Sequence, residues 1–148
     1  MIDSKQKGFT LLELLIVVVI LGVLALISTA FIINAADKAK NSAVRANIAA
    51  AASTITHKIT IDPIPHDELI EYTLTHLNNP DGIDDSGDEI MSPYNNKVVA
   101  FVTGGSAEAG QVTINSTGDI IIRIIGYGIA GSNAEPIMSK TVSTVQEE

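Results

Sequence analysis

Five acidic side chains crowd into nine residues in the second half of the chain: Asp81, Asp84, Asp85, Asp88 and Glu89. Carboxylate oxygens on a loop are ligands that Ca²⁺ prefers. The spacing does not follow the EF-hand pattern, and runs of like charge are usually solvated. Asp84, Asp85 and Asp88 are therefore weak candidates for a calcium site, and a solvated acidic loop is the alternative interpretation.

The other reactive side chains form no catalytic pattern. His57, His66 and His76 lack the spacing of a metal-binding helix, and we expect them to be solvated or to cap helices. The glycine-containing segment 104–110 lacks the ending of a phosphate-binding loop and predicts a hairpin loop. The chain has no cysteine, which excludes disulfides, Cys-ligated zinc and a Cys nucleophile. The sequence therefore predicts neither an enzyme nor a cofactor beyond the weak calcium candidate.

Length and charge narrow the function classes further. The chain has 148 residues and a formal net charge of −8. This length suits one domain, with room for an appendage. Direct binding of nucleic acid is not expected, because it needs basic patches that displace counterions from phosphates.

One carboxylate, Glu13, stands directly before a long apolar segment. Residues 14–33 are interrupted only by Gly22, Ser28 and Thr29 among apolar side chains. As a helix, this segment would span roughly 30 Å, the thickness of a bilayer core. Fifteen of its residues are Leu, Ile, Val or Phe, which supply roughly −5 to −9 kcal/mol of insertion free energy. The segment is therefore predicted to span a membrane.

Composition alone leaves three interpretations of this region open. Lys5 and Lys7, which precede the apolar run, suit a secretory signal peptide. They also suit a plain membrane anchor that starts in the cytoplasm. Neither interpretation explains Glu13, because an unpaired carboxylate in hydrocarbon costs several kcal/mol. The third interpretation must give this carboxylate a partner.

The residues around Glu13 resemble the N-terminus of type IV pilins, a family that includes the pseudopilins of type II secretion and competence systems. The resemblance is carried by KGFTLLE at residues 7–13 and LLIVVVILGVLA at residues 14–25, and it covers about residues 5–40. It implies a leader, residues 1–8, that a prepilin peptidase removes between Gly8 and Phe9, and N-methylation of the new Phe9 amine. Gly8 matters because that peptidase tolerates no bulky side chain before the cut bond.

The resemblance also supplies a partner for Glu13. Cleavage would create an ammonium group on Phe9, four residues before Glu13, and this cation could pair with the carboxylate in its own helix or in a neighbour. We therefore expect Glu13 to set the register in which subunits dock.

The leader holds two of the nine basic and one of the 17 acidic side chains, so the mature chain would have a net side-chain charge of about −9.

The chain departs from the family at one point. Many members have a proline near the position of Ala30, whereas no proline occurs here between Met1 and Asp62. Gly22, or the Ser28–Thr29 pair, would then have to provide any bend in the helix.

Major pseudopilins bind calcium in a loop of the head, which keeps the acidic loop described above under consideration.

We expect an α+β fold with four segments: a leader at 1–8, a membrane-spanning or filament-core helix at 9–33, an amphipathic continuation at 34–62 and a globular head at 63–148. Pro63 and Pro65 end the long helix. An apolar stripe at helical spacing should pack on the head. Its members are Val44, Ile48, Ala51, Ala52, Ile55 and Ile59.

Within the head, residues 67–77 read as a short helix, with Leu69, Ile70, Leu74 and Leu77 facing inward. Residues 97–103, 111–115 and 119–125 predict a three-stranded antiparallel meander, joined by hairpin loops at 104–110 and 116–118. Alternation places one set of side chains inward: Val112, Ile114, Ile120, Ile122 and Ile124. It places Gln111, Thr113 and Arg123 outward. The conformation of residues 126–148 is left open.

Taken together, the resemblance implies a structural subunit of a type IV pilus-like filament. Its partners would be other copies of the chain, a prepilin peptidase and methyltransferase, membrane lipid before assembly, and an inner-membrane assembly platform with its motor. The precursor would cross the inner membrane once from the cytoplasm, and the product would be an extracellular filament. The alternatives are a pseudopilin of a secretion or competence system and a membrane-anchored or secreted binding domain.

Overall fold

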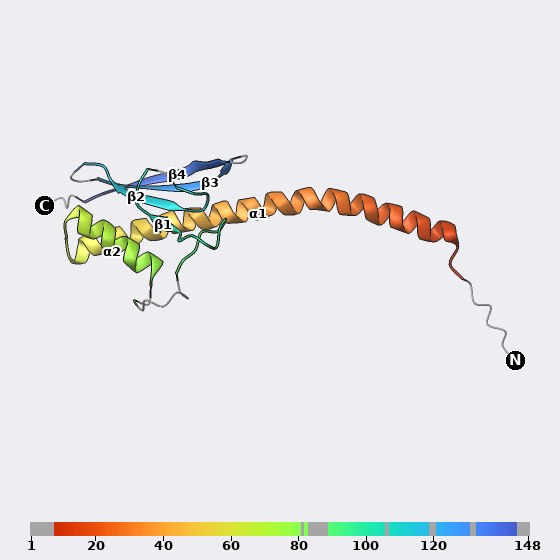
Figure 1. Ribbon diagram of the computed structural model, residues 1–148, viewed down its shortest axis with the longest axis horizontal. Helices are drawn as coiled ribbons and strands as arrows, with labels where there is room; N and C mark the ends of the chain where they lie inside the picture. The colour runs from red at the N-terminus through yellow and green to blue at the C-terminus, as the bar shows by residue number, and fades with distance from the viewer. Residues whose placement is uncertain are drawn as a thin grey trace. The chain divides into compact units, whose positions relative to one another are not determined.

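The computed structural model describes residues 8–80, 82, 89–105, 107–118, 121–130 and 133–144. The chain forms two compact units, residues 1–36 and 37–148. Within these described residues the element order is two helices followed by four strands, which confirms the α+β class (Figure 1).

The first helix, α1 (Leu11–Ile61), runs from one unit into the other. It contains no proline, and alanines are frequent in its second half, so its residues favour a helix throughout. It ends because Pro63 and Pro65 follow and cannot continue the helical hydrogen bonding. The last turn is closed by Lys58, whose ammonium group lies 2.7 Å from the Asp62 carboxylate.

The core of the second unit lies where α1 meets the sheet. Every member of the stripe expected from the sequence is buried: Val44, Ile48, Ala51, Ala52, Ile55 and Ile59. At Gly126 the sheet approaches α1 so closely that a Cβ atom would lie 2.6 Å from methyl groups of both Val44 and Ile48. Only glycine fits there without displacing its neighbours.

The second helix, α2 (His66–Asn78), confirms the short helix predicted at residues 67–77. Leu69 and Leu77 are buried, and Ile70 and Leu74 pack against the core from partly buried positions. The C-terminal end of α2 is fixed to the sheet by Asn78. Its side-chain amide donates to the Phe101 carbonyl at 2.8 Å and accepts from the Phe101 amide at 3.2 Å.

The sheet differs from the predicted meander in strand number and direction. In the part of the chain that the structure describes, it has four strands in the order β1 (Phe101–Val102), β2 (Val112–Ser116), β3 (Ile121–Ala130) and β4 (Asn133–Ser143). β1 pairs with β2 in parallel, so the loop at 104–110 is not a hairpin. β2, β3 and β4 pair antiparallel.

The first predicted strand is shorter than expected because its beginning pairs elsewhere. Residues 97–100 turn back on the segment before them: Met91 bridges Val99, and the Ala100 amide donates to the Ile90 carbonyl at 2.7 Å. Only Phe101 and Val102 remain to pair with β2. The turn between β2 and β3 is a hairpin as predicted, and Gly118 adopts a φ of +78° in it.

Alternation predicted the inward face of the strands correctly and the outward face only in part. Val112, Ile114, Ile122 and Ile124 are buried and Arg123 is exposed, as expected, whereas Ile120 lies outside the described residues. Gln111 and Thr113, expected outward, are also buried. Gln111 donates to the Val99 carbonyl and accepts from the Glu108 amide, both at 2.9 Å. The Thr113 hydroxyl donates to the Ile125 carbonyl at 3.5 Å, so both buried polar side chains have partners within the head.

Residues 126–144, left open by the sequence, complete the sheet. β3 extends to Ala130, and β4 pairs along it as an edge strand. The side chains of Pro136 and Lys140 are exposed. Proline and lysine suit an edge, where one side of the strand has no neighbour to pair with.

Candidate assembly and processing site

The start of α1 is held by a reciprocal pair of side chains. The backbone amide and the hydroxyl of Thr10 both donate to Oε2 of Glu13, at 3.0 and 2.9 Å. In return, the Glu13 amide donates to the Thr10 hydroxyl at 3.2 Å. This is a capping box, in which an N-cap threonine and the third helical residue satisfy each other's backbone amides.

Thr10 is the functional residue that our sequence reasoning missed. The pattern Thr-x-x-Glu directly before an apolar run is a recognised signature of a helix start, and it is visible at residues 10–13. The capping box gives Glu13 a local role in addition to the expected pairing with Phe9. Only Oε2 is used by Thr10, and among the described residues Oε1 accepts no hydrogen bond.

Gly8 and Phe9 lie before the helix, and both are exposed. A Cβ atom at Gly8 would meet nothing within 4 Å, and its backbone is not in the left-handed region. The fold therefore gives no steric reason for glycine at this position. The small residue that the resemblance implies at this position would therefore be needed by the protease and not by the fold.

The first unit has a surface that is apolar on all sides of the helix. Every large apolar side chain from Leu11 to Ile33 is exposed, down to the least exposed of them, Ile16 at 48%. Phe9 is 84% exposed. Among the described residues, α1 is long and apolar enough to cross a membrane. A helix that is apolar all round needs lipid or other helices around it.

Gly22 and the Ser28–Thr29 pair interrupt the apolar run of residues 14–33 in α1. A Cβ atom at Gly22 would also meet nothing within 4 Å. Ser28 donates to the Leu24 carbonyl at 2.8 Å, and Thr29 to the Ala25 carbonyl at 2.9 Å. Such bonds to the carbonyl four residues earlier satisfy hydroxyls in an apolar setting and often bend helices.

The calcium candidates Asp84, Asp85 and Asp88 lie outside the described residues. In the part of the chain that the structure describes, no three acidic or histidine side chains come together to hold a metal. His57 is exposed on α1. His66 forms a hydrogen bond through Nε2 with the Thr144 hydroxyl, and His76 stacks on Tyr72 with ring centroids 5.6 Å apart.

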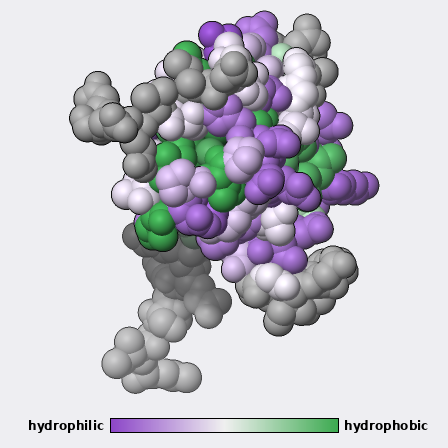
Figure 2. Space-filling view, turned by 90° about the vertical axis from the view of Figure 1, so that its left-hand side faces the viewer, coloured by the Kyte–Doolittle hydropathy of each residue, from purple (hydrophilic) through white to green (hydrophobic). Residues whose placement is uncertain are grey.

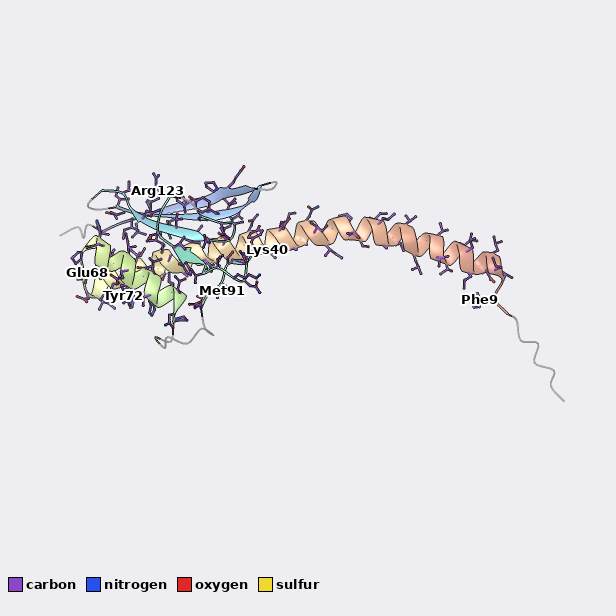
Figure 3. All side chains as sticks on the ribbon, viewed as in Figure 1. Phe9, Lys40, Glu68, Tyr72, Met91 and Arg123 are labelled. Atoms are coloured by element: carbon purple, nitrogen blue, oxygen red, sulfur yellow. The ribbon has the colours of Figure 1, made fainter. Side chains whose placement is uncertain are left out.

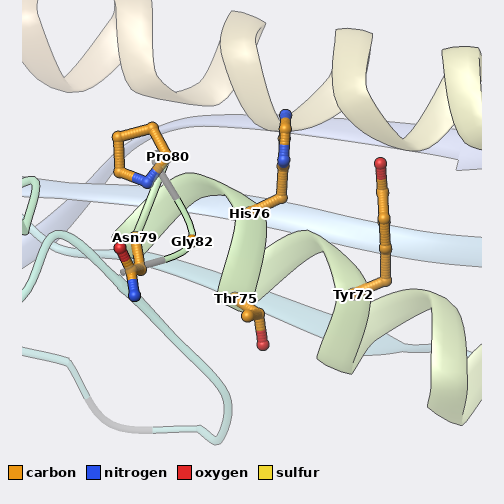
Figure 4. A pocket seen from close by; sticks show the side chains of 6 residues that line it. All are labelled: Tyr72, Thr75, His76, Asn79, Pro80 and Gly82. Atoms are coloured by element: carbon orange, nitrogen blue, oxygen red, sulfur yellow. The ribbon is translucent and has the colours of Figure 1, made fainter. Parts of the chain in front are cut away.

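A shallow pocket lies at the end of α2 (Figure 4). Its volume is about 240 Å³. It is lined by Tyr72, Thr75, His76, Asn79, Pro80 and Gly82. The pocket holds no pairing of a nucleophile with a base, so it gives no support for catalysis.

The comparisons with known proteins agree with the geometry of the N-terminus. Residues 3–29 match the model of the prokaryotic N-terminal methylation motif. The segment is a prepilin-type N-terminus. This motif is the hallmark of the N-terminus of type IV pilins and pseudopilins, and it supports a pilin-like or pseudopilin substrate of prepilin peptidase. No curated protein and no solved structure matches the chain.

The prepilin-type N-terminus and the geometry of α1 occupy the same residues. The motif includes Gly8, Phe9, the capping box and the apolar helix as far as Thr29. The motif and the exposed apolar helix together support a precursor that is anchored in a membrane by α1. The matched motif is typical of structural, pilin-type proteins and not of enzymes.

Proposed function

We propose that the chain is a structural pilin subunit that polymerises through α1 into a type IV pilus-like surface filament. The observation that carries this proposal is the run of exposed large apolar side chains in residues 14–33, which follows the capped Glu13 of the methylation motif. Lipid would cover this surface in the precursor, and the helices of neighbouring subunits would cover it in the filament.

The proposed sequence of events begins with cleavage. Prepilin peptidase removes residues 1–8, and the new amine of Phe9 is methylated. The subunit then remains in the inner membrane as a single-pass protein, with its positive N-terminus facing the cytoplasm. A motor on an inner-membrane platform extracts it, and the filament emerges at the cell surface.

Burial of α1 between other copies stabilises the filament. A large apolar side chain that moves from water to a packed interior contributes about 1.5–3 kcal/mol. Extraction from lipid offsets much of this gain, because the acyl chains already shield the helix from water. The register in which the helices pack must therefore come from polar contacts that lipid does not supply.

Glu13 is the side chain suited to that task. Its Oε2 atom accepts from Thr10 of its own helix, which leaves Oε1 for the Phe9 ammonium of a neighbouring subunit. In hydrocarbon, a paired carboxylate is far more favourable than an unpaired one. An incoming helix would consequently settle where one ammonium meets one carboxylate. Gly22 would give α1 the local freedom to adjust to its neighbours.

Two measurements on cells that produce the chain with its peptidase and motor test the proposal. Intact mass of the purified protein should show an N-terminus at methylated Phe9. Electron microscopy of sheared surface material should show filaments whose main component has this mass. Short filaments retained inside the envelope would favour the pseudopilin alternative instead. A mature protein that starts at another residue would contradict both and favour an anchored or secreted binding domain.

A further inference from the structure

In the second unit, most basic side chains of α1 and the acidic side chains of α2 lie toward opposite ends. Near the start of this unit, α1 carries three cations, Lys38, Lys40 and Arg45, which we call the base surface. Between Arg45 and Lys58 the helix has no Asp, Glu, Lys or Arg side chain. Figure 3 shows Lys40 at one end of the head and Glu68 at the other.

The opposite end is acidic around an exposed apolar residue. Ile61, the last residue of α1, is 68% exposed. Asp62 follows it directly in the chain, and the first two turns of α2 carry further exposed carboxylates. We call this set, Ile61, Asp62, Asp67, Glu68 and Glu71, the tip surface. Viewed from this end, the head shows hydrophilic side chains around a few apolar ones (Figure 2).

Few of these charges are neutralised within the chain. Among the described residues the one ion pair found joins Lys58 to Asp62. Lys58, the cation beside the tip surface, is therefore already paired. Lys58 also lies over the Tyr72 ring, 4.9 Å from its centroid, so this cation is held in place. Asp37 is the one opposite charge beside the base surface on α1. Lys38, Arg45 and Glu71 remain without an ionic partner in the described chain.

Glu71 is the most informative of the tip carboxylates. Asp67 and Glu68 stand in the first turn of α2, where the helix dipole favours acidic side chains. Glu71 is beyond that turn and lies next to both of them at i,i+4 and i,i+3 spacing, where like charges destabilise a helix. The isolated head therefore gains nothing from this carboxylate, and an external cation would relieve the repulsion.

We propose that the tip surface of one copy docks on the base surface of the next copy in the filament. This inference rests on the proposed function. A contact between two different surfaces of the same chain generates an open polymer in which all copies point the same way. Tip against tip would place carboxylates face to face, so charge also disfavours the wrong orientation. Ile61 supplies the apolar centre and the acidic side chains supply the polar rim of the contact.

Charge reversal in filaments of the full chain tests the contact. Glu71→Lys and Arg45→Glu should each reduce the fraction of sheared filaments that sediments at moderate salt by about fivefold, whereas the double variant should recover most of it. Arg123→Glu is the matched control, because Arg123 is equally exposed but lies on the sheet. Added salt should loosen wild-type filaments in the same direction.

The outcomes separate this inference from the proposed function. Single variants that sediment like the control, or a double variant no better than the singles, would overturn the docking contact alone. Absence of filaments from the wild-type chain would overturn the proposed function and this inference with it. If a reversal lowers the helical content of the solubilised protein, Glu71→Gln and Arg45→Gln replace it, and each should still weaken sedimentation.

Discussion

The carboxylate of Glu13 is shared between two donors of Thr10, its backbone amide and its hydroxyl, at 3.0 and 2.9 Å. The same side chain that was expected to fix the filament register therefore also starts the helix. The two roles need different properties, since capping needs an acceptor and register needs a negative charge. Substitutions that remove one property at a time separate them.

Glu13→Gln should retain the cap and lose the charge, because glutamine also serves in a capping box. If register depends on the ion pair with Phe9, filament yield should fall by more than about tenfold, since removing one partner strands the other in hydrocarbon. Glu13→Ala should behave similarly and still insert into the membrane. Yield is measured on sheared filaments and insertion by resistance to alkaline extraction. Normal filaments from Glu13→Ala would contradict the register role.

Thr10→Val should remove the hydroxyl of the cap and leave the carboxylate charge. Loss of an N-cap side chain costs about 1 kcal/mol of helix stability. We expect a smaller fall in filament yield than for Glu13→Gln, and Thr10→Ser is the control that keeps the hydroxyl. If Thr10→Val abolished filaments while Glu13→Gln spared them, capping and not charge would be the role of Glu13.

Gly8→Leu should block removal of residues 1–8, because the bulky side chain would stand directly before the bond to be cut. The fold itself tolerates the change, since a Cβ atom at Gly8 meets nothing within 4 Å. The precursor should accumulate in the membrane with its leader attached, as judged by intact mass. Gly8→Ala is the matched control and should still be processed. Mature protein in normal amount from Gly8→Leu would refute the assignment of the cleavage site.

Gly22→Ala should stabilise α1 as an isolated helix by about 1 kcal/mol, because glycine is a poor helix former and the space for a methyl group is open. If Gly22 instead allows bending or close approach in the filament, the same change should lower filament yield. Ala25→Gly, one turn later, controls for helix propensity alone. Unchanged yield with Gly22→Ala would remove Gly22 from the assembly residues.

Gly126→Val should destabilise the head, because its side chain would enter the space of Val44 and Ile48. Overpacking of this kind costs about 1–3 kcal/mol in the free energy of unfolding and should lower Tm by several degrees. Scanning calorimetry of the solubilised full chain measures it. Gly105→Val is the control, since Gly105 is exposed with open space around its Cβ position. Equal Tm values for the two variants would contradict the close approach of sheet and helix.

The sequence by itself determined the structure of the N-terminal helix and the side of α1 that packs on the sheet. The capping pattern, the apolar run and the prolines act through neighbours within a few residues, so their consequences follow from local chemistry. The stripe from Val44 to Ile59 was predictable for the same reason, because helical periodicity assigns one side of α1 to the core.

Tertiary structure alone decided the rest. β1 is short because the segment before it folds back on Met91, and it pairs in parallel with β2; no local pattern encodes either contact. Thr113 is buried, against its alternation, and its hydroxyl donates to the Ile125 carbonyl of β3 at 3.5 Å. β4 forms because β3 offers it an edge, although Pro136 and Lys140 are poor strand formers. In each case the deciding partner is distant in sequence, and only folding brings it into contact.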